Sequence, residues 1–491
     1  MSMNRRSFLR NTLAATAALS LPARVYAAAE GANGDIRIGA IGFKGRGMAN
    51  INGLLGAKGV RLTALCDVDQ GVLDKGRSHF AGKGFECETF TDVRKMLESK
   101  EIDAVMIATP NHWHSLAGIW AAQAGKDVYV EKPVSHNVFE GRKLVEAARK
   151  HERIIQTGTQ SRSSGGLHAA AKWGQAGNLG KLLWARGTCY KRRASIGKVE
   201  GEQPIPAGVD YDLWCGPAPK KPLSRKQLHY DWHWVWDTGN GDLGNQGIHQ
   251  MDIARWFLGE AALSPLVYSV GGRLGYEDDG ETPNTQLVVH GYEKAPLYFE
   301  VQGLPESADS KKMGNYRGSG VGVIVQYENG HILIPSYTGA TAYDKSGKEI
   351  MRWGNAKGES PKGEEEKRED HYKNFISAVR SRKHSELSAD IEEGHISSAL
   401  CHTGNISYLL GKKSSPDQIK EQVKSDSEAV DSIERMIEHL AANKVDVKMD
   451  QLTLGPVLKM DPKTEKFIGN PEADKLLTRE YRAPFVVPEK V

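Results

Sequence analysis

The sequence predicts an α/β protein in which a doubly wound parallel sheet is followed by a second α/β domain with an open, mainly antiparallel sheet. Short apolar runs typical of buried strands alternate with helix-length segments from residue 36 to about residue 151. A glycine-rich turn, Gly42–Gly47, follows the first run and opens the first helix. Beyond about residue 160, longer alternating segments separated by Gly/Pro turns indicate antiparallel strands with one open face.

The elements of the first part have clear boundary signals. Asp92 is a helix N-cap candidate, Gly125 ends a helix, and Pro133 stops the strand that precedes it. We expect strands over 36–41, 60–66, 104–108 and 127–131, and helices over 48–55, 92–99, 114–124 and 138–151. Strands and helices that alternate in this way form βαβ units and a parallel sheet.

Beyond about residue 160 the expected strands are longer and no longer alternate regularly with helices. We expect strands over 181–190, 266–272, 285–289 and 297–302, a solvated loop over 357–369, and helices over 246–258, 370–379, 391–410 and 428–442. The predicted domains are a signal peptide at 1–29, a nucleotide-binding domain at 35–160, a substrate and oligomerisation domain at 161–415, and a helical and extended tail at 416–491.

Composition excludes several classes of function. The chain has 491 residues, enough for two or three domains, and a net charge of only +4, which gives no argument for nucleic acid or an anionic membrane. Its five cysteines are scattered and odd in number, so a disulfide framework is not expected. We interpret the basic run at 191–193 as a solvated face or a substrate rim.

The N-terminus resembles a twin-arginine export signal. Arg5 and Arg6 precede Phe8 and Leu9, a mildly apolar run follows, and small residues near 25–29 form an A-x-A-like cleavage site. No later run reaches the roughly 18 apolar residues of a membrane span. We therefore expect an exported, periplasmic protein.

The glycine turn predicts a dinucleotide site of the Rossmann type. A turn between a strand and a helix directs backbone N–H groups at a phosphate, and Asp67 lies where an acid binds the ribose hydroxyls of NAD and repels the 2′-phosphate of NADP. The middle glycine of G-x-G-x-x-G is replaced by Lys44, so either the turn is displaced or Lys44 adds a cation there.

A charged pair, Glu131–Lys132, stands at the end of an apolar strand and is followed by Pro133. This places an amine at the carboxyl edge of a parallel sheet, where open α/β folds bind ligands. A surface Lys-Pro turn is the alternative for the tripeptide alone.

Together these motifs resemble the Gfo/Idh/MocA oxidoreductases, the family of glucose-fructose oxidoreductase and inositol dehydrogenase. The matching segments are 42–47, Asp67, 108–114 (ATPNHWH), 131–133 (EKP) and 247–252 (GIHQMD). The similarity runs from about residue 35 to about residue 415, and residues 461–488 resemble the tail of an exported bacterial branch. The resemblance implies a sugar or polyol substrate between the domains and a homo-oligomer formed through the C-terminal sheet.

The resemblance also assigns residues. It implies that Lys132 contacts the reacting hydroxyl and that His249 is the acid/base, which suits a side chain that titrates near neutrality. Where the family often carries an Asp one helical turn before this His, the chain has Asn245. The expected dinucleotide contacts are Gly42, Lys44, Gly45, Arg46, Gly47, Asp67, Thr109, Pro110, Asn111, Glu131, Lys132 and Gln160.

Further candidates for catalysis or substrate contact are His114, Asn245, Tyr190, Trp236, Asp237 and Arg162. The segment at 229–237, HYDWHWVWD, combines aromatic faces that can stack on sugar rings with acids and histidines that bond hydroxyls, or it is a packed aromatic core. A zinc site from His229, His233 and Asp237 is conceivable at this spacing, but we expect no metal.

The main prediction is an oxidoreductase that transfers hydride between a sugar or glycoside and tightly bound NAD. An exported protein meets no maintained pool of free NAD, so the cofactor must be bound before export and return its hydride. The alternative is an NAD-dependent glycosidase that works by oxidation at carbon 3, elimination, hydration and re-reduction, with His114 as a candidate second base or as a contact on the nicotinamide side. A carbohydrate-binding protein on the same fold is the non-enzymatic alternative.

Overall fold

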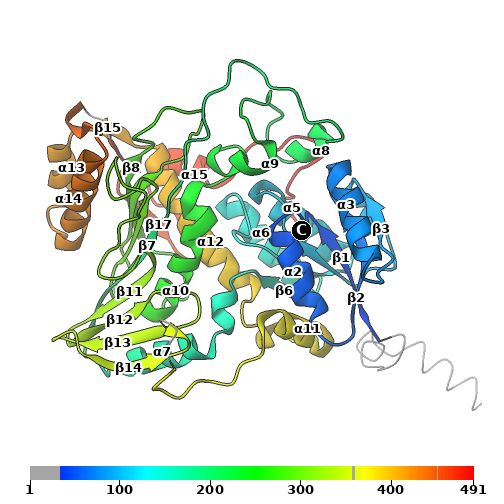
Figure 1. Ribbon diagram of the computed structural model, residues 1–491, viewed down its shortest axis with the longest axis horizontal. Coiled ribbons are helices and arrows are strands. Elements are labelled where there is room, and N and C mark those ends of the chain that lie inside the picture. Colours follow the sequence, from blue (N-terminus) through cyan, green and yellow to red (C-terminus); the bar gives the residue numbers. More distant parts are fainter. Residues whose placement is uncertain (1–33, 357–359, 450–451) are drawn as a thin grey trace, which may run out of the picture.

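The computed structural model describes residues 34–356, 360–449 and 452–491. The predicted signal peptide at 1–29 lies outside these residues. Two sheets, one in each lobe, organise the described chain (Figure 1). The predicted fold class is confirmed.

The N-terminal lobe is a Rossmann domain whose six strands all run parallel in the order β3-β2-β1-β4-β5-β6. The strands are β1 (Ile36–Ile41), β2 (Val60–Cys66), β3 (Glu88–Phe90), β4 (Ala104–Ile107), β5 (Asp127–Val130) and β6 (Ile155–Thr157). The helices between them are α2 (Arg46–Leu55), α3 (Gln70–Ala81), α4 (Val93–Leu97), α5 (Asn111–Gln123) and α6 (Val138–Lys150). Strands β4 and β5 are buried at every position, as expected for central parallel strands.

Helix α5 begins three residues earlier than predicted, because Pro110 takes the N-cap position and places Asn111 in the first turn. The sequence analysis also omitted α3, β3 and β6. Helix α3 is capped by Asp69, whose side chain accepts from the N–H groups of Gly71 and Val72.

The C-terminal lobe is built on a sheet in which β7 and β10 pair in parallel and the other neighbours pair antiparallel. Its strands are β7 (Leu182–Tyr190), β8 (Leu266–Gly272), β9 (Thr285–His290), β10 (Leu297–Gln302), β11 (Val321–Tyr327), β12 (Gly330–Ile334), β13 (Ala340–Asp344), β14 (Glu349–Trp353), β15 (Lys412–Ser414), β16 (Leu452–Leu454), β17 (Leu458–Asp461) and β18 (Lys466–Phe467). Its order is β14-β13-β12-β11-β7-β10-β9-β8-β16-β15, with β17 also on β8.

Helices cover both faces of this sheet (Figure 1). The helices of this lobe and its connections are α7 (Gly165–Gln175), α8 (Tyr211–Cys215), α9 (Leu228–Asp231), α10 (Ile248–Leu258), α11 (His371–Ser381), α12 (Ile391–Leu409), α13 (Pro416–Val423), α14 (Ser427–Ala442) and α15 (Pro471–Lys475). Helices α7, α10 and α12 pack on one face, and α13 and α14 pack on the other.

The outer face of the sheet is therefore less open than the sequence analysis expected. Leu287, Tyr298 and Ile324 of this face share an apolar cluster with Ile433 and Met436 of α14. Burial of such side chains contributes roughly 1.5–3 kcal/mol each. A partner subunit cannot occupy this part of the face while α13 and α14 remain on it.

A buried ion-pair network fixes α14 to the sheet. The carboxylate of Glu300 on β10 accepts hydrogen bonds from Arg186 of β7, from Arg435 of α14 at 2.6 Å and from the Ser432 hydroxyl at 2.9 Å. Arg186 has no exposed side-chain area. Burial raises the pKa of Glu300, but the hydrogen bonds and charges of Arg435 and Arg186 lower it to about 2.

The chain crosses between the lobes more than once. Phe375 and Ile376 of α11 pack in the core of the N-terminal lobe, and so do Phe485 and Val487 of the last segment. The C-terminus consequently lies against the N-terminal lobe (Figure 1). Among the described residues, no helix has the length and apolarity needed to cross a membrane.

Candidate functional site

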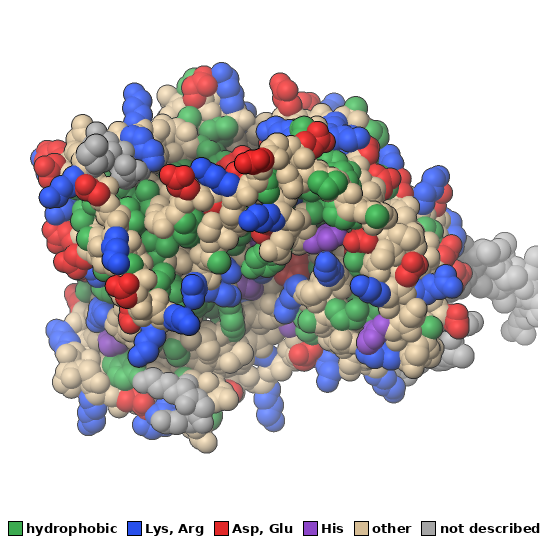
Figure 2. All heavy atoms as spheres, turned by 45° about the horizontal axis from the view of Figure 1, so that its top comes forward, with side chains coloured by type: hydrophobic (Ala, Val, Ile, Leu, Met, Phe, Trp, Pro, Cys, Tyr) green, Lys and Arg blue, Asp and Glu red, His purple; other side chains and the backbone are tan. Residues whose placement is uncertain are grey.

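A cavity of about 770 Å³ lies at the carboxyl edge of the parallel sheet. Gly42, Asp67, Ala108 and Glu131, which directly follow β1, β2, β4 and β5, line it together with a segment from the C-terminal lobe at residues 206–233. The surface is hollowed between the two lobes, with Lys, Arg and His side chains along the hollow (Figure 2). This is the position at which open α/β sheets bind ligands.

The glycine turn leaves one end of the cavity open to a phosphate. Gly42 and Gly45 have φ of 69° and 61°, and a Cβ on Gly42 would lie 2.9 Å from Thr109. A Cβ on Gly45 would meet no atom within 4 Å, so the backbone faces free space there. Helix α2 starts at Arg46 without a side-chain cap, so its first N–H groups are available to an anion. A Cβ on Gly47 would lie 2.4 Å from the carbonyl of Gly42, which explains that glycine as a packing requirement.

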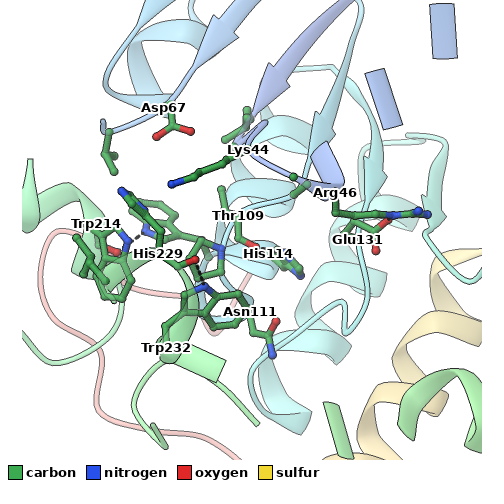
Figure 3. A pocket seen from close by; sticks show the side chains of 18 of the residues that line it. Lys44, Arg46, Asp67, Thr109, Asn111, His114, Glu131, Trp214, His229 and Trp232 are labelled. Carbon is green, nitrogen blue, oxygen red and sulfur yellow. Dashed lines mark hydrogen bonds and ion pairs between the residues drawn. The ribbon is translucent and has the colours of Figure 1, made fainter. Parts of the chain in front are cut away.

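Lys44 and Arg46 point in different directions. Lys44 extends across the cavity toward Asp67, while Arg46 turns to Glu131 (Figure 3). The Arg46 guanidinium donates from Nε to Glu131 at 2.9 Å, and the Asn50 amide donates to the same oxygen at 3.0 Å. The replacement of the usual glycine by Lys44 therefore adds a cation to the cavity.

Asp67 is the acid at the far end of the cavity. Burial raises its pKa to about 6, although the Asp69 N–H donates to it at 3.1 Å. Asp69 in turn contacts Nε2 of His229 at 2.9 Å. Residues 206–233 of the C-terminal lobe form the roof of the cavity, and this contact ties the roof to the loop that carries the acid.

Lys132 joins the two lobes at the other end. Its Nζ donates to the carbonyl oxygen of Asn245 at 2.6 Å. Burial lowers the pKa of Lys132, and Glu131 beside it acts in the opposite direction. Burial also raises the pKa of Glu131, but the charges of Arg46 and Lys132 lower it to about 2, so Glu131 is an anion that pairs with Arg46.

The backbone before His249 is a π-helical turn over Leu243–Gly247, which continues into α10. Such turns widen a helix locally and frequently occur at functional sites. His249 lies edge-on to Tyr337, with ring centroids 5.2 Å apart, and its Nδ1 atom has no hydrogen-bond partner. Burial lowers the pKa of His249 to about 3, and the charge of Lys132 acts in the same direction. His249 is therefore a neutral imidazole near the Lys132 ammonium.

His114 lies at the cavity wall but does not present a free nitrogen. Its Nδ1 is 2.6 Å from the carbonyl of Pro133 and its Nε2 is 2.7 Å from the carbonyl of Thr109. It connects the EKP turn to the loop after β4. This geometry does not support the expectation that His114 is a second base.

The other expected substrate residues have partners away from the cavity lining. Tyr190 donates to Glu300 in the network under α14, and Arg162 pairs with Asp252 at 2.8 Å. The ring of Trp236 lies 6.3 Å from that of Tyr408, while its backbone N–H donates to Glu281 at 2.6 Å, and Asp237 pairs with Lys221 at 2.6 Å. Gln160 contacts the Tyr129 hydroxyl at 2.9 Å and Glu131 at 3.5 Å, so it lies behind the EKP turn.

The three residues of the conceivable zinc site have separate partners. His229 contacts Asp69, His233 contacts the carbonyl of Tyr230 at 2.6 Å, and Asp237 is paired with Lys221. Within residues 34–356, 360–449 and 452–491, no group of His, Cys, Asp and Glu side chains could hold a metal ion.

Sequence reasoning missed most of the roof. Pro206, Leu213 and Trp214 line the cavity, and backbone bonds hold this segment against the N-terminal lobe. The Gln70 N–H donates to Gly208 at 3.0 Å, and the Asp210 N–H donates to Val68 at 2.9 Å. The tryptophan-rich stretch at 229–237 was a usable signal for part of this roof. The stretch at 206–216 carries no comparable pattern.

Comparison with known proteins agrees with both lobes. The oxidoreductase family model with an NAD-binding Rossmann fold matches residues 36–159, and the model of the same family's C-terminal α/β domain matches residues 185–282. The chain belongs to the Gfo/Idh/MocA oxidoreductase family.

Two curated proteins are similar to parts of the chain. Levoglucosan dehydrogenase of Pseudarthrobacter phenanthrenivorans is 29% identical over 189 residues, 38% of this chain and 40% of the relative. An α-N-acetylgalactosaminidase of Tannerella forsythia is 32% identical over 166 residues, 32% of this chain and 34% of the relative. The chain thus aligns with less than half the length of each.

Solved structures of the same fold extend further along the chain. A levoglucosan dehydrogenase in complex with NADH covers 86% of this chain and 99% of its own, with a TM-score of 0.54 and 17% identity. The WlbA dehydrogenase of Bordetella pertussis, in complex with NADH and UDP-GlcNAcA, covers 74% and 93%, with a TM-score of 0.54 and 19% identity. At these identities the likeness establishes the fold.

Proposed function

We propose that the protein is an NAD-dependent oxidoreductase that acts on a sugar or glycoside and keeps its dinucleotide bound. The observation that carries the proposal is the cross-lobe contact of Lys132 with the π-turn before His249, at one end of a cavity that has Asp67 at the other. Lys132 lines the cavity there, and the neutral imidazole of His249 follows the π-turn close enough for the charge of Lys132 to lower its pKa. Removal of a proton and a hydride from an alcohol requires this combination.

The residues of the cavity fit a dinucleotide. The open backbone at Gly45 and the uncapped start of α2 suit a pyrophosphate, and Lys44 and Arg46 supply positive charge beside it. Asp67 suits ribose hydroxyls and disfavours the 2′-phosphate of NADP, so the preference is for NAD. A dinucleotide held by these residues would supply the acceptor for a hydride from the carbinol carbon.

The side chains have distinct roles in the proposed reaction. The Lys132 ammonium stabilises negative charge that develops on the reacting oxygen. His249, neutral because burial lowers its pKa to about 3, takes the O–H proton and returns it in the reverse step. Asn245 replaces an acid that family members often carry, so its side chain can bond a hydroxyl but cannot hold an imidazolium by charge.

A second candidate is a glycosidase that oxidises carbon 3 transiently and restores its hydride at the end of each cycle. The roof supports it: the contacts of His229 with Asp69 and of Gly208 with Gln70 close the cavity over the dinucleotide end, which disfavours exchange of the cofactor. The name of the galactosaminidase relative is consistent with this candidate. A carbohydrate-binding protein without catalysis is the third candidate.

A turnover assay separates these candidates. The purified protein is incubated with a panel of free sugars, glycosides and N-acetylhexosaminides while absorbance at 340 nm and products are followed. Net reduction of added NAD indicates a dehydrogenase, and product without net reduction indicates the closed cycle. No product and no absorbance change with any sugar that binds would leave only the binding protein.

Two proposals concern the setting of the enzyme. Export by the twin-arginine route rests on the sequence of residues 1–29 and is tested by the N-terminal mass of the protein in a periplasmic fraction. A homo-oligomer through the C-terminal sheet would use β12–β14, because α13 and α14 cover much of the rest. Analytical ultracentrifugation tests it.

A further inference from the structure

A second histidine from a different segment faces the same cavity as Lys132. His233 follows α9 in a short 3₁₀ turn, Trp232–Trp234, and lines the cavity together with Lys132 and Asn245. His249, by contrast, belongs to α10. The sequence analysis considered His233 only as a possible metal ligand or part of an aromatic cluster.

The tautomer of His233 is determined by its surroundings. Nδ1 lies 2.6 Å from the carbonyl oxygen of Tyr230, and a carbonyl can only accept, so Nδ1 carries the hydrogen. No described residue makes a hydrogen bond to Nε2. The nitrogen that remains therefore presents a free lone pair.

The ring is also held in one orientation. The ring stacks on that of Trp232, with centroids 3.7 Å apart and an angle of 20° between the planes. The centroid of the Trp234 ring is 5.8 Å from that of His233. Burial lowers the pKa of His233 to about 4, and the charges of Lys132 and Arg193 act in the same direction. Its ring therefore remains a neutral acceptor at neutral pH, close to the cationic end of the cavity.

We infer that His233 is a second catalytic base, which removes the proton from the carbon next to the carbinol that His249 and Lys132 help to oxidise. The inference rests on the proposed function, because that carbon becomes acidic only when its neighbour is a ketone. It also favours a redox-neutral reaction over simple dehydrogenation, since oxidation of an alcohol alone needs one base.

The step balances without a further reagent. The C–H bond breaks, its proton bonds to Nε2 of His233, and its electron pair enters the ketone to give an enolate whose oxygen Lys132 stabilises. Collapse of the enolate then either expels the group on the next carbon, as in glycoside cleavage, or takes a proton back from Nε2. In the first case the hydroxyl of a water adds to the alkene, the other proton of that water goes to the oxygen of the leaving group, and the proton held by Nε2 returns to the carbon.

The test supplies the ketone directly, so that hydride transfer is not required. Methyl 3-keto-β-glucopyranoside and the corresponding galactoside are incubated with the protein in D₂O. NMR measures hydrogen exchange at the carbon between the ketone and the anomeric carbon. The wild type is expected to accelerate exchange, and His79→Gln, at an exposed position on α3 away from the cavity, to retain that acceleration. His233→Gln is expected to lose it by about 100-fold or more.

His233→Asn is the matched control for a structural role. Its amide can still donate to the Tyr230 carbonyl, so it preserves the local bond while removing Nε2, and thermal unfolding of all variants checks the fold. Loss of exchange in His233→Asn with an unchanged unfolding temperature supports the base. Exchange at the wild-type rate in this variant, or no exchange by the wild type with either ketone, overturns the inference.

The outcomes are separate from those of the proposed function. If the wild type turns over sugars while His233→Asn exchanges normally, only the role of His233 is wrong. If the wild type exchanges the supplied ketones but never oxidises an alcohol, the proposed hydride transfer is wrong and the base remains.

Discussion

Lys132 of the N-terminal lobe and Asn245 of the C-terminal lobe are joined by a 2.6 Å hydrogen bond between an ammonium group and a main-chain carbonyl. Because the acceptor is a backbone atom, the contact does not depend on the side chain at position 245. It positions the ammonium beside the π-turn that leads to His249. This bond therefore holds the cation against the C-terminal lobe at the reactive end of the cavity.

Lys132→Met removes this charge while keeping most of the side-chain length. We expect kcat to fall about 10²–10³-fold, the loss typical of one group that stabilises a developing oxyanion, with bound NAD retained. Lys83→Met, at an exposed position on the same lobe, is the control. Turnover of Lys132→Met at the wild-type rate would refute the assigned role.

The fold and half of the site follow from local sequence signals. The glycine turn, Asp67 and the EKP turn could be predicted because each lies at the end of a buried strand, and parallel strands bring their carboxyl ends to one edge. His114 was predicted as a base from its position in the sequence, directly after the loop that follows β4. Its two carbonyl partners, Thr109 and Pro133, depend on how two loops meet.

The roof and the covered sheet face could not be predicted for the same reason. Trp214 and Pro206 reach the cavity only because backbone bonds hold residues 208–210 against the start of α3. Helix α14 has a clear apolar face, but its sequence does not say which surface that face covers. The pairing of Arg186 with Glu300 and Glu428 settles it in three dimensions.

Asp67 links stability to pH in a defined direction. Its folded pKa of about 6 exceeds the ordinary value near 4, so the folded protein without cofactor binds this proton more tightly than the unfolded chain. The contribution of Asp67 to the free energy of unfolding therefore falls as the pH rises from about 4 to about 6. Cofactor-free Asp67→Asn should unfold at a higher temperature than wild type at pH 7.5, and the difference should vanish below pH 4.

The same substitution should have the opposite effect on ligand binding. Asp67→Asn is expected to lower the affinity for NAD and to reduce the difference in affinity between NAD and NADP, as measured by calorimetry. If the cofactor-free variant is less stable than wild type at pH 7.5 and binds NAD equally well, Asp67 is not a buried ribose ligand.

His229→Ala should loosen the roof. It removes the contact with Asp69 at 2.9 Å, worth roughly 1 kcal/mol for a half-buried pair. We expect bound NAD to dissociate about five times faster, measured by transfer to an excess of a scavenging dehydrogenase. His79→Ala, an exposed histidine on α3, should leave the rate unchanged, and an equal rate in both variants would show that the roof does not retain the cofactor.

Glu300→Gln should weaken the attachment of α14 to the sheet and lower the free energy of unfolding. It leaves the guanidinium groups of Arg186 and Arg435 without their shared carboxylate, and breaking a buried pair of this kind costs about 3–5 kcal/mol in the free energy of unfolding. Glu434→Gln removes only an exposed partner of Lys420 and should cost less than about 0.5 kcal/mol. Denaturant unfolding with hydrogen exchange over 427–442 measures both. Equal stabilities would contradict the assigned network.

The most direct test of the central claim is the content of the cavity. Protein purified without added cofactor is denatured, and the released dinucleotide is quantified by absorbance at 260 and 340 nm and identified by mass. We expect about one NAD(H) per chain. Protein that carries no dinucleotide and reduces added NAD would show an exchanging cofactor, and protein that carries NADP would contradict the role given to Asp67.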